Sequence, residues 1–183
     1  KIGGGEIGGW HNMWGGIVVL PTFLIMGTQK GGTTSLYDAV TRHPMAGRAT
    51  KKEVHFFDRY YDRGMEWYEQ QFDLKPHQSQ IGEATPIYMY DPDVRHRIAT
   101  ELPGVKVVVT LRDPVRRAYS HFWHSHRYGR ETVTTFEDAV ALEVERLTTA
   151  PSRQRGWWSY LDRGRYIDQL EALEKNFGRD SIC

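Results

Sequence analysis

The sequence predicts an α/β fold with three layers, in which helices cover both faces of a central parallel sheet. Short apolar runs alternate along the chain with longer segments whose apolar residues recur at helical spacing, a pattern typical of parallel sheets. A glycine-rich loop directly follows the first apolar run and opens a helix. The chain has 183 residues, which is enough for one such domain with its own core.

The predicted domain begins with a buried strand over 22–26, a short apolar run bounded by proline and glycine. A helix is predicted over 34–42, because Leu36 and Val40 are at helical spacing and a His-Pro pair follows. Further elements follow in order: a short strand or edge segment over 53–57, a helix over 65–72, a short strand over 80–83 and a helix over 93–102.

The clearest strand in the chain is predicted over 106–111, which contains three consecutive valines. Asp113 and Pro114 then open a helix, because Asp is a favoured N-cap and Pro a favoured first helical residue. Three aromatic residues are expected on the core side of this helix: Tyr119, Phe122 and Trp123.

Two further helices are predicted, over 135–147 and over 165–177. Thr135 and Asp138 form a capping signal at the start of the first helix, and Gly178 stops the second. Residues 181–183 are expected to begin another strand. We therefore expect the domain, assigned to residues 22–183, to be truncated, with its C-terminal part missing.

Residues 1–21 contain three glycine clusters and are predicted to be a flexible lead-in to the domain. Trp10 and Trp14 are the residues of this lead-in that are suited to dock on the domain. No apolar run reaches the roughly 18 residues that a membrane span needs, so none is predicted. The sequence leaves open the oligomeric state and the compartment, which would be the cytoplasm in a bacterium or the Golgi lumen in a eukaryote.

The net charge, the single cysteine and the histidines limit which ligands the chain can bind. With 24 Lys and Arg against 23 Asp and Glu, the formal net charge is +1. No nucleic-acid partner is expected, and any anion site must be local. The single cysteine, Cys183, excludes an internal disulfide and a cysteine-based metal site. His121, His124 and His126 cluster without a metal-binding motif, so we interpret them as exposed or capping residues and predict no metal.

The glycine-rich loop resembles a phosphate-binding P-loop with a displaced lysine. Gly27 and Gly32 keep the Walker spacing, but Thr33 occupies the lysine position, and the lysine lies inside the loop as Lys30. Backbone N–H groups of residues 30–34 can converge on a phosphate at the helix N-terminus, where the dipole favours negative charge.

Five consecutive residues are the candidate phosphate ligands: Lys30, Gly31, Gly32, Thr33 and Thr34. The glycines allow close approach of the backbone, and the threonine hydroxyls add donors. A triphosphatase would also need a magnesium-binding carboxylate, and the best candidate, Asp113, is better explained as a helix cap. We interpret the loop as a phosphate binder for another transfer chemistry; the alternative is a turn that binds nothing.

A second anion anchor is predicted where the strand over 106–111 ends. Arg112 lies at the edge where ligands of open parallel sheets bind, and Ser120 lies about two helical turns beyond Asp113. A guanidinium and a hydroxyl so placed can hold a second phosphate away from the loop. The alternative assigns Arg112 to a surface ion pair and Ser120 to a helix face.

Together these residues resemble the sulfotransferase superfamily that uses 3′-phosphoadenylyl sulfate (PAPS). The resemblance is closer to the branch with the heparan sulfate glucosaminyl N- and 3-O-sulfotransferases and their bacterial relatives, and it covers most of the chain, from Phe23 to Ser181. Four sequence blocks carry it in family order: Gly27–Thr34, Lys52–Asp58, Gly82–Pro86 and Leu111–Ser120.

The resemblance implies a role for each anion anchor. The residues Lys30–Thr34 would hold the 5′-phosphosulfate of PAPS, and Lys30 would stabilise the leaving phosphate and the sulfonate oxygens. Arg112 and Ser120 would hold the 3′-phosphate. Adenosine 3′,5′-bisphosphate (PAP) would be the product, and no metal would be required.

The resemblance also implies an acceptor site in the second block. Glu53 would be the general base, and His55 and Asp58 would line the site. The alternative for Glu53 is a salt bridge with a neighbouring lysine, Lys51 or Lys52.

Glu83, in the third block, is the rival carboxylate for the role of base. Next to it, Ala84 stands where many relatives carry a lysine able to contact a polyanionic sugar, and no Lys-Gly-Arg segment of the family follows Ser181. The sequence therefore predicts a PAPS-dependent sulfotransferase acting on a hydroxyl or amine of a small-molecule or carbohydrate acceptor. The alternatives are a P-loop kinase or nucleotide-binding protein, and a catalytically inactive nucleotide-binding domain.

Overall fold

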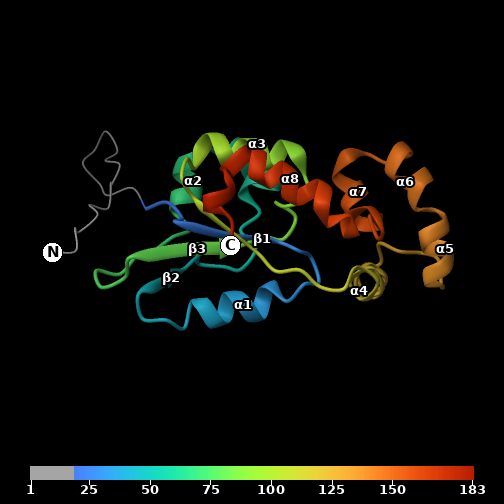
Figure 1. The fold of residues 1–183 in the computed structure, drawn as a ribbon, viewed down its shortest axis with the longest axis horizontal. Coiled ribbons are helices and arrows are strands. Elements are labelled where there is room, and N and C mark those ends of the chain that lie inside the picture. Colours follow the sequence, from blue (N-terminus) through green and yellow to red (C-terminus); the bar gives the residue numbers. More distant parts are fainter. Residues whose placement is uncertain (1–18) are drawn as a thin grey trace.

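The computed structural model describes residues 19–183, so most of the lead-in, with Trp10 and Trp14, lies outside the described residues. A parallel sheet with the strand order β2-β3-β1-β4 forms the centre of the fold (Figure 1). Its strands are β1 (Phe23–Gly27), β2 (Ala46–Arg48), β3 (Gln80–Ala84) and β4 (Lys106–Val109). Leu24 of β1 is paired with Glu83 of β3 on one side and with Val107 of β4 on the other.

Helices cover both faces of the sheet, as the sequence predicts (Figure 1). One face is covered by α1 (Thr33–Val40). The other is covered by α2 (Met65–Glu69), α3 (Pro92–Glu101) and α8 (Tyr166–Phe177). Four helices form a group beyond the ends of β1 and β4: α4 (Pro114–Arg127), α5 (Phe136–Ala141), α6 (Glu143–Thr149) and α7 (Ser152–Trp158).

The alternation of side chains along β1 divides the core into two layers, because successive strand residues face opposite sides of a sheet. Phe23 and Ile25 pack with Tyr37 of α1 on one face. Leu24 and Met26 belong to the larger cluster on the other face. All five residues are buried, so β1 is the centre of the core and the loop that follows it begins from a fixed position.

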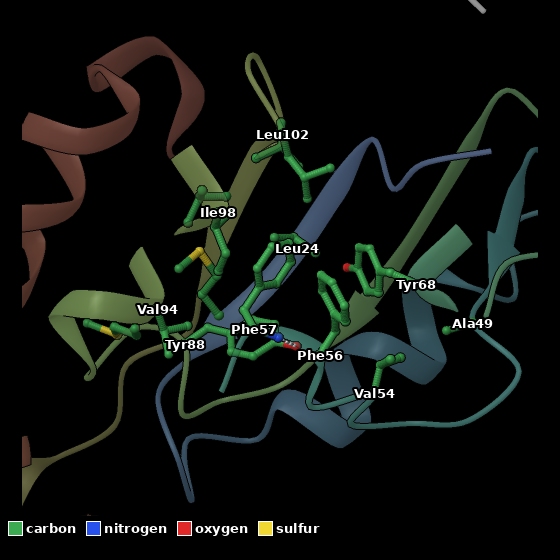
Figure 2. Packing of buried hydrophobic residues seen from close by; sticks show 14 of the residues in the cluster. Leu24, Ala49, Val54, Phe56, Phe57, Tyr68, Tyr88, Val94, Ile98 and Leu102 are labelled. Carbon is green, nitrogen blue, oxygen red and sulfur yellow. Dashed lines mark hydrogen bonds between the residues drawn. The ribbon is translucent and has the colours of Figure 1, made fainter. Parts of the chain in front are cut away.

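The larger cluster is rich in aromatic rings that pack against one another (Figure 2). Phe56 and Tyr68 stack with their ring centroids 4.5 Å apart. Phe57 meets Tyr68 edge to face at 5.1 Å and Tyr88 at 5.6 Å. These four residues are fully buried, and the two phenylalanines thereby fix the segment that carries the predicted acceptor residues.

The predicted strand or edge segment over 53–57 is wrong. Glu53 and His55 have φ angles of 58° and 57°, in the left-handed region that strands do not use. A single π-helical turn, Phe56–Tyr60, follows, and a 3₁₀ turn, Tyr61–Arg63, leads to α2. The strand that the sequence reasoning missed is β2, three residues long and earlier in the chain.

The other predicted elements are present with small shifts of their ends, except that the helix over 135–147 is divided in two. Thr135 caps α5 by accepting a hydrogen bond from the N–H of Asp138 at 3.2 Å, as predicted. At the start of α6, Glu143 is buried and its carboxylate accepts the N–H groups of Leu161 and Asp162. This contact with a distant segment accompanies the break between the two helices.

The remaining predicted boundary signals also have the expected geometry. Asp113 caps α4 through a 2.8 Å hydrogen bond from the N–H of Arg116. Gly178 ends α8 with a φ of 76°. Beyond a 3₁₀ turn, Arg179–Ser181, Ile182 forms a parallel bridge with Val107, so the chain enters the sheet beside β4. Within residues 19–183, no helix has the length and apolar character needed to cross a membrane.

Candidate functional site

The glycine-rich loop has a backbone shape that only particular residues can adopt. It connects the end of β1 at Gly27 with the first residue of α1, Thr33. Lys30 and Gly32 have φ angles of 65° and 97°. A Cβ atom at Gly31 would lie 2.7 Å from the carbonyl oxygen of Thr110, which is too close for any side chain. Glycine at position 31 therefore lets the loop lie directly against the segment that follows β4.

The start of α1 presents free backbone donors. The first N–H groups of any helix have no partner within the helix, and no side chain caps α1. Among the described residues, no backbone carbonyl accepts the N–H groups of Lys30, Gly32, Thr33 or Thr34. Together with the helix dipole, these donors form a site suited to an anion.

Lys30 lies partly buried among other cations. Burial, followed by the charges of Arg127 and Arg112, lowers the pKa of the Lys30 ammonium. These positive charges repel one another. An anionic ligand placed among them would relieve the repulsion and raise the pKa of the Lys30 ammonium.

A cleft of about 680 Å³ brings the loop and the predicted second anchor together. Lys30, Arg112 and Ser120 all line it, as the resemblance implies for the two ends of one donor molecule. Nη1 of Arg112 also donates to the carbonyl oxygen of Lys30 at 3.2 Å. Arg112 is thus an exposed cation at the cleft with no carboxylate partner among the ion pairs of the described residues.

Sequence reasoning missed most of the remaining cleft wall. The other lining residues are Val115, Arg116, Tyr119, Trp123, His124, Arg127, Phe136 and Glu137. The expectation that Tyr119 and Trp123 face the core is wrong, because they are 49% and 47% exposed, whereas Phe122 is buried as predicted. Helical spacing of three and four residues from Arg112 and Ser120 was the signal that could have identified this face of α4.

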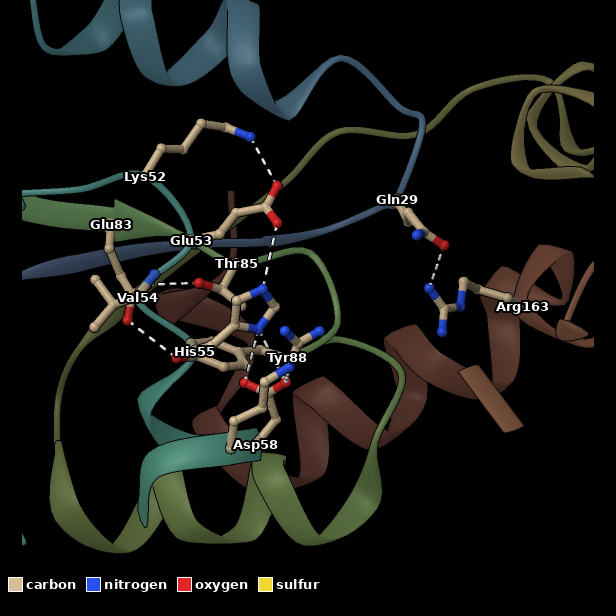
Figure 3. Close-up of polar contacts among 11 residues, drawn as sticks. Gln29, Lys52, Glu53, Val54, His55, Asp58, Glu83, Thr85, Tyr88 and Arg163 are labelled. Atoms are coloured by element: carbon tan, nitrogen blue, oxygen red, sulfur yellow. Dashed lines mark hydrogen bonds and ion pairs between the residues drawn. The ribbon is translucent and has the colours of Figure 1, made fainter. Parts of the chain in front are cut away.

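The predicted acceptor residues Glu53, His55 and Asp58 form a chain of charged groups (Figure 3). Nδ1 of His55 lies 2.9 Å from the Asp58 carboxylate, and Nε2 lies 3.4 Å from Oε2 of Glu53. The other oxygen of Glu53, Oε1, lies 2.8 Å from Nζ of Lys52. The salt bridge that was the alternative reading of Glu53 therefore exists alongside the contact with His55.

These contacts shift the pKa values of Glu53 and His55 in opposite directions. The hydrogen bond with His55, together with Lys52, lowers the pKa of Glu53 to about 2 although burial opposes the shift. Burial alone would lower the pKa of His55, but the hydrogen bonds with Asp58 and Glu53 outweigh it and raise the pKa. Glu53 is therefore ionised at neutral pH, and His55 is held toward its protonated form.

The charge of Glu53 influences two residues of the cleft wall. Burial and Lys30 lower the pKa of His124 in the cleft wall, whereas Glu53 raises it. Glu53 likewise raises the pKa of Lys30, against the larger lowering effects. Glu53 and His55 do not line the cleft themselves, but the charge of Glu53 acts on two residues that do, Lys30 and His124.

Comparison with known proteins assigns the family of this fold and site. The family model described as "Sulfotransferase domain" matches residues 20–171. The chain belongs to the sulfotransferase domain family. The match includes the loop, the Glu53 segment and the Arg112 segment, so the family resemblance of the sequence is confirmed.

The chain is similar to several proteins of this family. It is 33% identical over 172 residues to the membrane-associated sulfotransferase kil1 of Dictyostelium discoideum, covering 90% of this chain and 35% of that protein. It is 35% identical over 165 residues to human heparan sulfate glucosamine 3-O-sulfotransferase 3B1, covering 86% of this chain and 39% of the relative. The chain thus spans little more than a third of the length of these relatives.

A solved structure has the same fold. The sulfotransferase from Alicyclobacillus acidocaldarius superposes with a TM-score of 0.79 and 31% identity, over 91% of this chain and 72% of that one. The α/β fold with a parallel sheet is therefore that of a sulfotransferase. Nothing in the comparisons favours the P-loop kinase alternative.

In this sulfotransferase domain, the rival carboxylate Glu83 is a structural group. It is fully buried and accepts hydrogen bonds from the Thr85 hydroxyl at 2.6 Å and the Val54 N–H at 3.1 Å (Figure 3). The Tyr68 hydroxyl donates to it at 2.7 Å. The Tyr88 hydroxyl donates at 3.2 Å. Burial raises the pKa of Glu83 against these hydrogen bonds.

Ala84 and the possible metal ligands were also singled out by the sequence. Ala84 is fully buried in the smaller core cluster beside Tyr37, so its position supplies no cation to the site. Within the part of the chain that the structure describes, no three His, Cys, Asp or Glu side chains are grouped closely enough to hold a metal.

Proposed function

We propose that this domain transfers the sulfuryl group of PAPS to a hydroxyl or amine of a carbohydrate or other small acceptor. One observation carries the proposal: a single cleft joins the donor-rich loop at Lys30 to Arg112 and Ser120. Two anion sites in one cleft suit a nucleotide with phosphates at two ends. Membership of the sulfotransferase family supports the assignment of PAPS as that nucleotide.

In this proposal, the loop holds the 5′-phosphosulfate and the second anchor holds the 3′-phosphate. The N–H groups of Gly32, Thr33 and Thr34 bind phosphosulfate oxygens, with Gly31 allowing the close approach. Arg112 and Ser120 donate to the 3′-phosphate. Such charge-assisted hydrogen bonds are stronger than neutral ones, and they orient the sulfur toward the Lys30 end of the cleft.

The transfer step exchanges one S–O bond for another. The acceptor oxygen or nitrogen forms a bond to sulfur while the bond between sulfur and the 5′-phosphate oxygen breaks, and PAP leaves. Lys30 stabilises the negative charge that develops on the leaving oxygen. Glu53 takes the acceptor proton as general base, while His55 and Asp58 line the acceptor position and orient the Glu53 carboxylate.

The low pKa of Glu53 sets a condition on this mechanism. A carboxylate with a pKa of about 2 is a weak base. It becomes a stronger one when the approaching acceptor takes the place of Lys52 at Oε1, because the loss of a cationic partner raises a carboxyl pKa. The Lys52 ammonium is then free to meet a sulfonate oxygen or an anionic acceptor.

The names of the relatives, rather than a single contact, support the proposed acceptor class. The human relative is named as a heparan sulfate glucosamine 3-O-sulfotransferase, and another relative as an N-deacetylase/N-sulfotransferase. A saccharide hydroxyl or amine is therefore the first acceptor to test.

Transfer of labelled sulfate from PAPS to a panel of saccharides, phenols and amines tests the proposal. We expect PAP formation that depends on the acceptor and is independent of ATP. Magnesium-dependent ATP hydrolysis without sulfate transfer would instead establish the kinase alternative. PAP binding without turnover on any acceptor would establish an inactive nucleotide-binding domain.

A further inference from the structure

We infer that the segment over 161–169 is a brace that positions both donor-binding elements of the cleft. Arg163 holds the glycine-rich loop, and Tyr166 holds the backbone at the second anchor. Neither residue lines the cleft, so both act through other residues. The inference rests on the proposed function, because it concerns how the domain binds the two ends of PAPS.

The first contact of the brace joins Arg163 to Gln29, the residue before Lys30. Nη1 of Arg163 donates to Oε1 of Gln29 across 134 positions of sequence (Figure 3). Arg163 is 2% exposed. Its guanidinium carbon lies 4.4 Å from the centre of the Tyr90 ring, and Nη2 donates to the carbonyl oxygen of Gly156 at 3.3 Å.

Arg163 is itself held in place on a short 3₁₀ turn, Asp162–Gly164. Asp162 accepts a 2.6 Å hydrogen bond from the Tyr90 hydroxyl. The buried Glu143 carboxylate accepts the N–H groups of Leu161 and Asp162 at 2.7 and 2.8 Å. The turn that presents the guanidinium therefore has little freedom to move.

Arg163 is charged as well as buried, so its guanidinium depends on the hydrogen-bond acceptors around it. Burial, followed by the charge of Arg117, lowers the pKa of Arg163 to about 10, so the side chain remains a cation at neutral pH. A buried cation needs acceptors. Among the described residues, Gln29 supplies the side-chain acceptor and Gly156 a backbone one.

The second contact of the brace joins Tyr166 to Arg112. The Tyr166 hydroxyl donates to the carbonyl oxygen of Arg112 at 2.8 Å. Gln169, on the same helix as Tyr166, donates its amide to the carbonyl oxygen of Arg163 at 2.9 Å and so joins this helix to the turn that carries Arg163. Nine consecutive residues thus contact both chain segments that carry the proposed phosphate ligands.

The consequence is preorganisation of the donor site. PAPS must meet the loop donors and the Arg112 guanidinium at the same time, and any freedom in their separation is lost on binding. The brace restricts that freedom before the donor arrives. Its loss should therefore weaken the affinity for the nucleotide and leave the affinity for the acceptor unchanged.

The test uses the full-length protein and isothermal titration with PAP. We expect Tyr166→Phe, which removes a single hydroxyl, to weaken PAP binding by about fivefold, the equivalent of one net hydrogen bond. Arg163→Met should weaken it by about tenfold or more, and Arg163→Lys, which keeps a cationic donor, by less. Transfer assays should show a raised KM for PAPS with an unchanged KM for the acceptor.

Matched controls separate the brace from general damage to the fold. Tyr61→Phe removes a tyrosine hydroxyl that donates to Glu101 at 2.6 Å, away from the cleft. Arg97→Lys changes an arginine that stacks on Tyr61 at 4.7 Å and donates to a backbone carbonyl. Both controls should bind PAP as the unchanged protein does.

A double variant tests the route through the loop. If Arg163 acts through Gln29, Gln29→Ala combined with Arg163→Met should bind PAP no more weakly than the weaker of the two single variants. Fully additive losses would overturn this route.

The failure of the brace and the failure of the proposed function give different results. Unchanged PAP affinity in Tyr166→Phe and Arg163→Met, with an active parent protein, would overturn the brace alone. A fall in stability with both KM values unchanged would reduce the segment to a structural role and also overturn it. A parent protein that neither binds PAP nor transfers sulfate would overturn the proposed function, and the brace with it.

Discussion

Arg112 and Lys30 are in direct contact, because Nη1 of Arg112 donates to the Lys30 carbonyl oxygen at 3.2 Å. The two residues follow neighbouring parallel strands, β1 and β4. The proposed ligands of the two phosphates thus share a hydrogen bond at the edge of the sheet where such folds bind ligands. The contact fixes the position of Arg112 relative to the loop, and with it the separation of the two proposed phosphate sites.

Lys30→Met should lower kcat for sulfate transfer by about 100-fold or more, because it removes the cation nearest the proposed leaving oxygen. PAP binding should weaken less than kcat falls, since the loop N–H groups remain. Steady-state transfer assays and titration with PAP measure the two effects. Lys75→Met, at an exposed loop position, is the control. An equal loss in both variants would contradict the assignment.

Glu53→Gln should abolish transfer and leave PAP affinity within about twofold, because the amide keeps the shape of the carboxylate but cannot accept the proton. Single-turnover measurements with preloaded PAPS isolate this step from binding. Glu66→Gln, on the exposed side of α2, should retain full activity. Turnover that survives in Glu53→Gln would assign the base elsewhere.

Asp58→Asn should lower the pKa of His55. The hydrogen bond with Asp58 raises that pKa above its ordinary value of 6.5, against the effect of burial. A raised pKa stabilises the fold below the unfolded-state value, and that contribution is lost as the pH rises through the folded-state value. The variant should therefore lose stability mainly at low pH. NMR titration of the His55 ring and urea unfolding at pH 5 and pH 8 measure both effects.

An unchanged titration curve for His55 in Asp58→Asn would show that Asp58 does not govern its charge. Asp62→Asn, in the exposed 3₁₀ turn nearby, provides the control for a general change in surface charge.

Glu83→Gln should destabilise the fold by about 2–4 kcal/mol, because it sets an amide against several buried donors. Tyr68→Phe, which removes one of those donors, should cost only about 1 kcal/mol. Urea unfolding measures both. The raised pKa of Glu83 means that its folded form binds a proton more tightly than its unfolded form, so this group makes stability fall as the pH rises above 4.5. Equal losses in both variants would contradict the central role of Glu83.

The sequence was a good guide to the elements whose signals are local. The strand at 106–109 and the helix capped by Asp113 need only the identity of adjacent residues. The segment over 53–57 was misassigned because its β-branched and aromatic residues favour a strand. In the fold, Phe56 and Phe57 pack against Tyr68, and the backbone is left-handed at Glu53 and His55.

In the candidate site, too, residues that belong to local motifs were predicted, and contacts between distant residues were not. Lys30, Arg112 and Ser120 were selected from motif spacing, and the fold brings them to one cleft. The contacts of Glu83 with Tyr68 and Val54, and of Arg163 with Gln29, join residues 15 to 134 positions apart. The spacing of residues along a single sequence does not indicate which distant residues form such contacts. These contacts could be identified only from the structure.

The hydrogen bond from Val54 to Glu83 has a consequence for how acceptor preference can change. Val54, between Glu53 and His55, is fully buried, and its N–H donates to the buried Glu83 carboxylate at 3.1 Å. This hydrogen bond anchors the backbone of the proposed acceptor segment to the core independently of the exposed Lys51 and Arg59 side chains. Lys51, Lys52 and Arg59 can then be varied without loss of the fold. A combinatorial library at these three positions, with Glu83 and Val54 kept, should therefore yield folded variants that can be screened for activity on new acceptors.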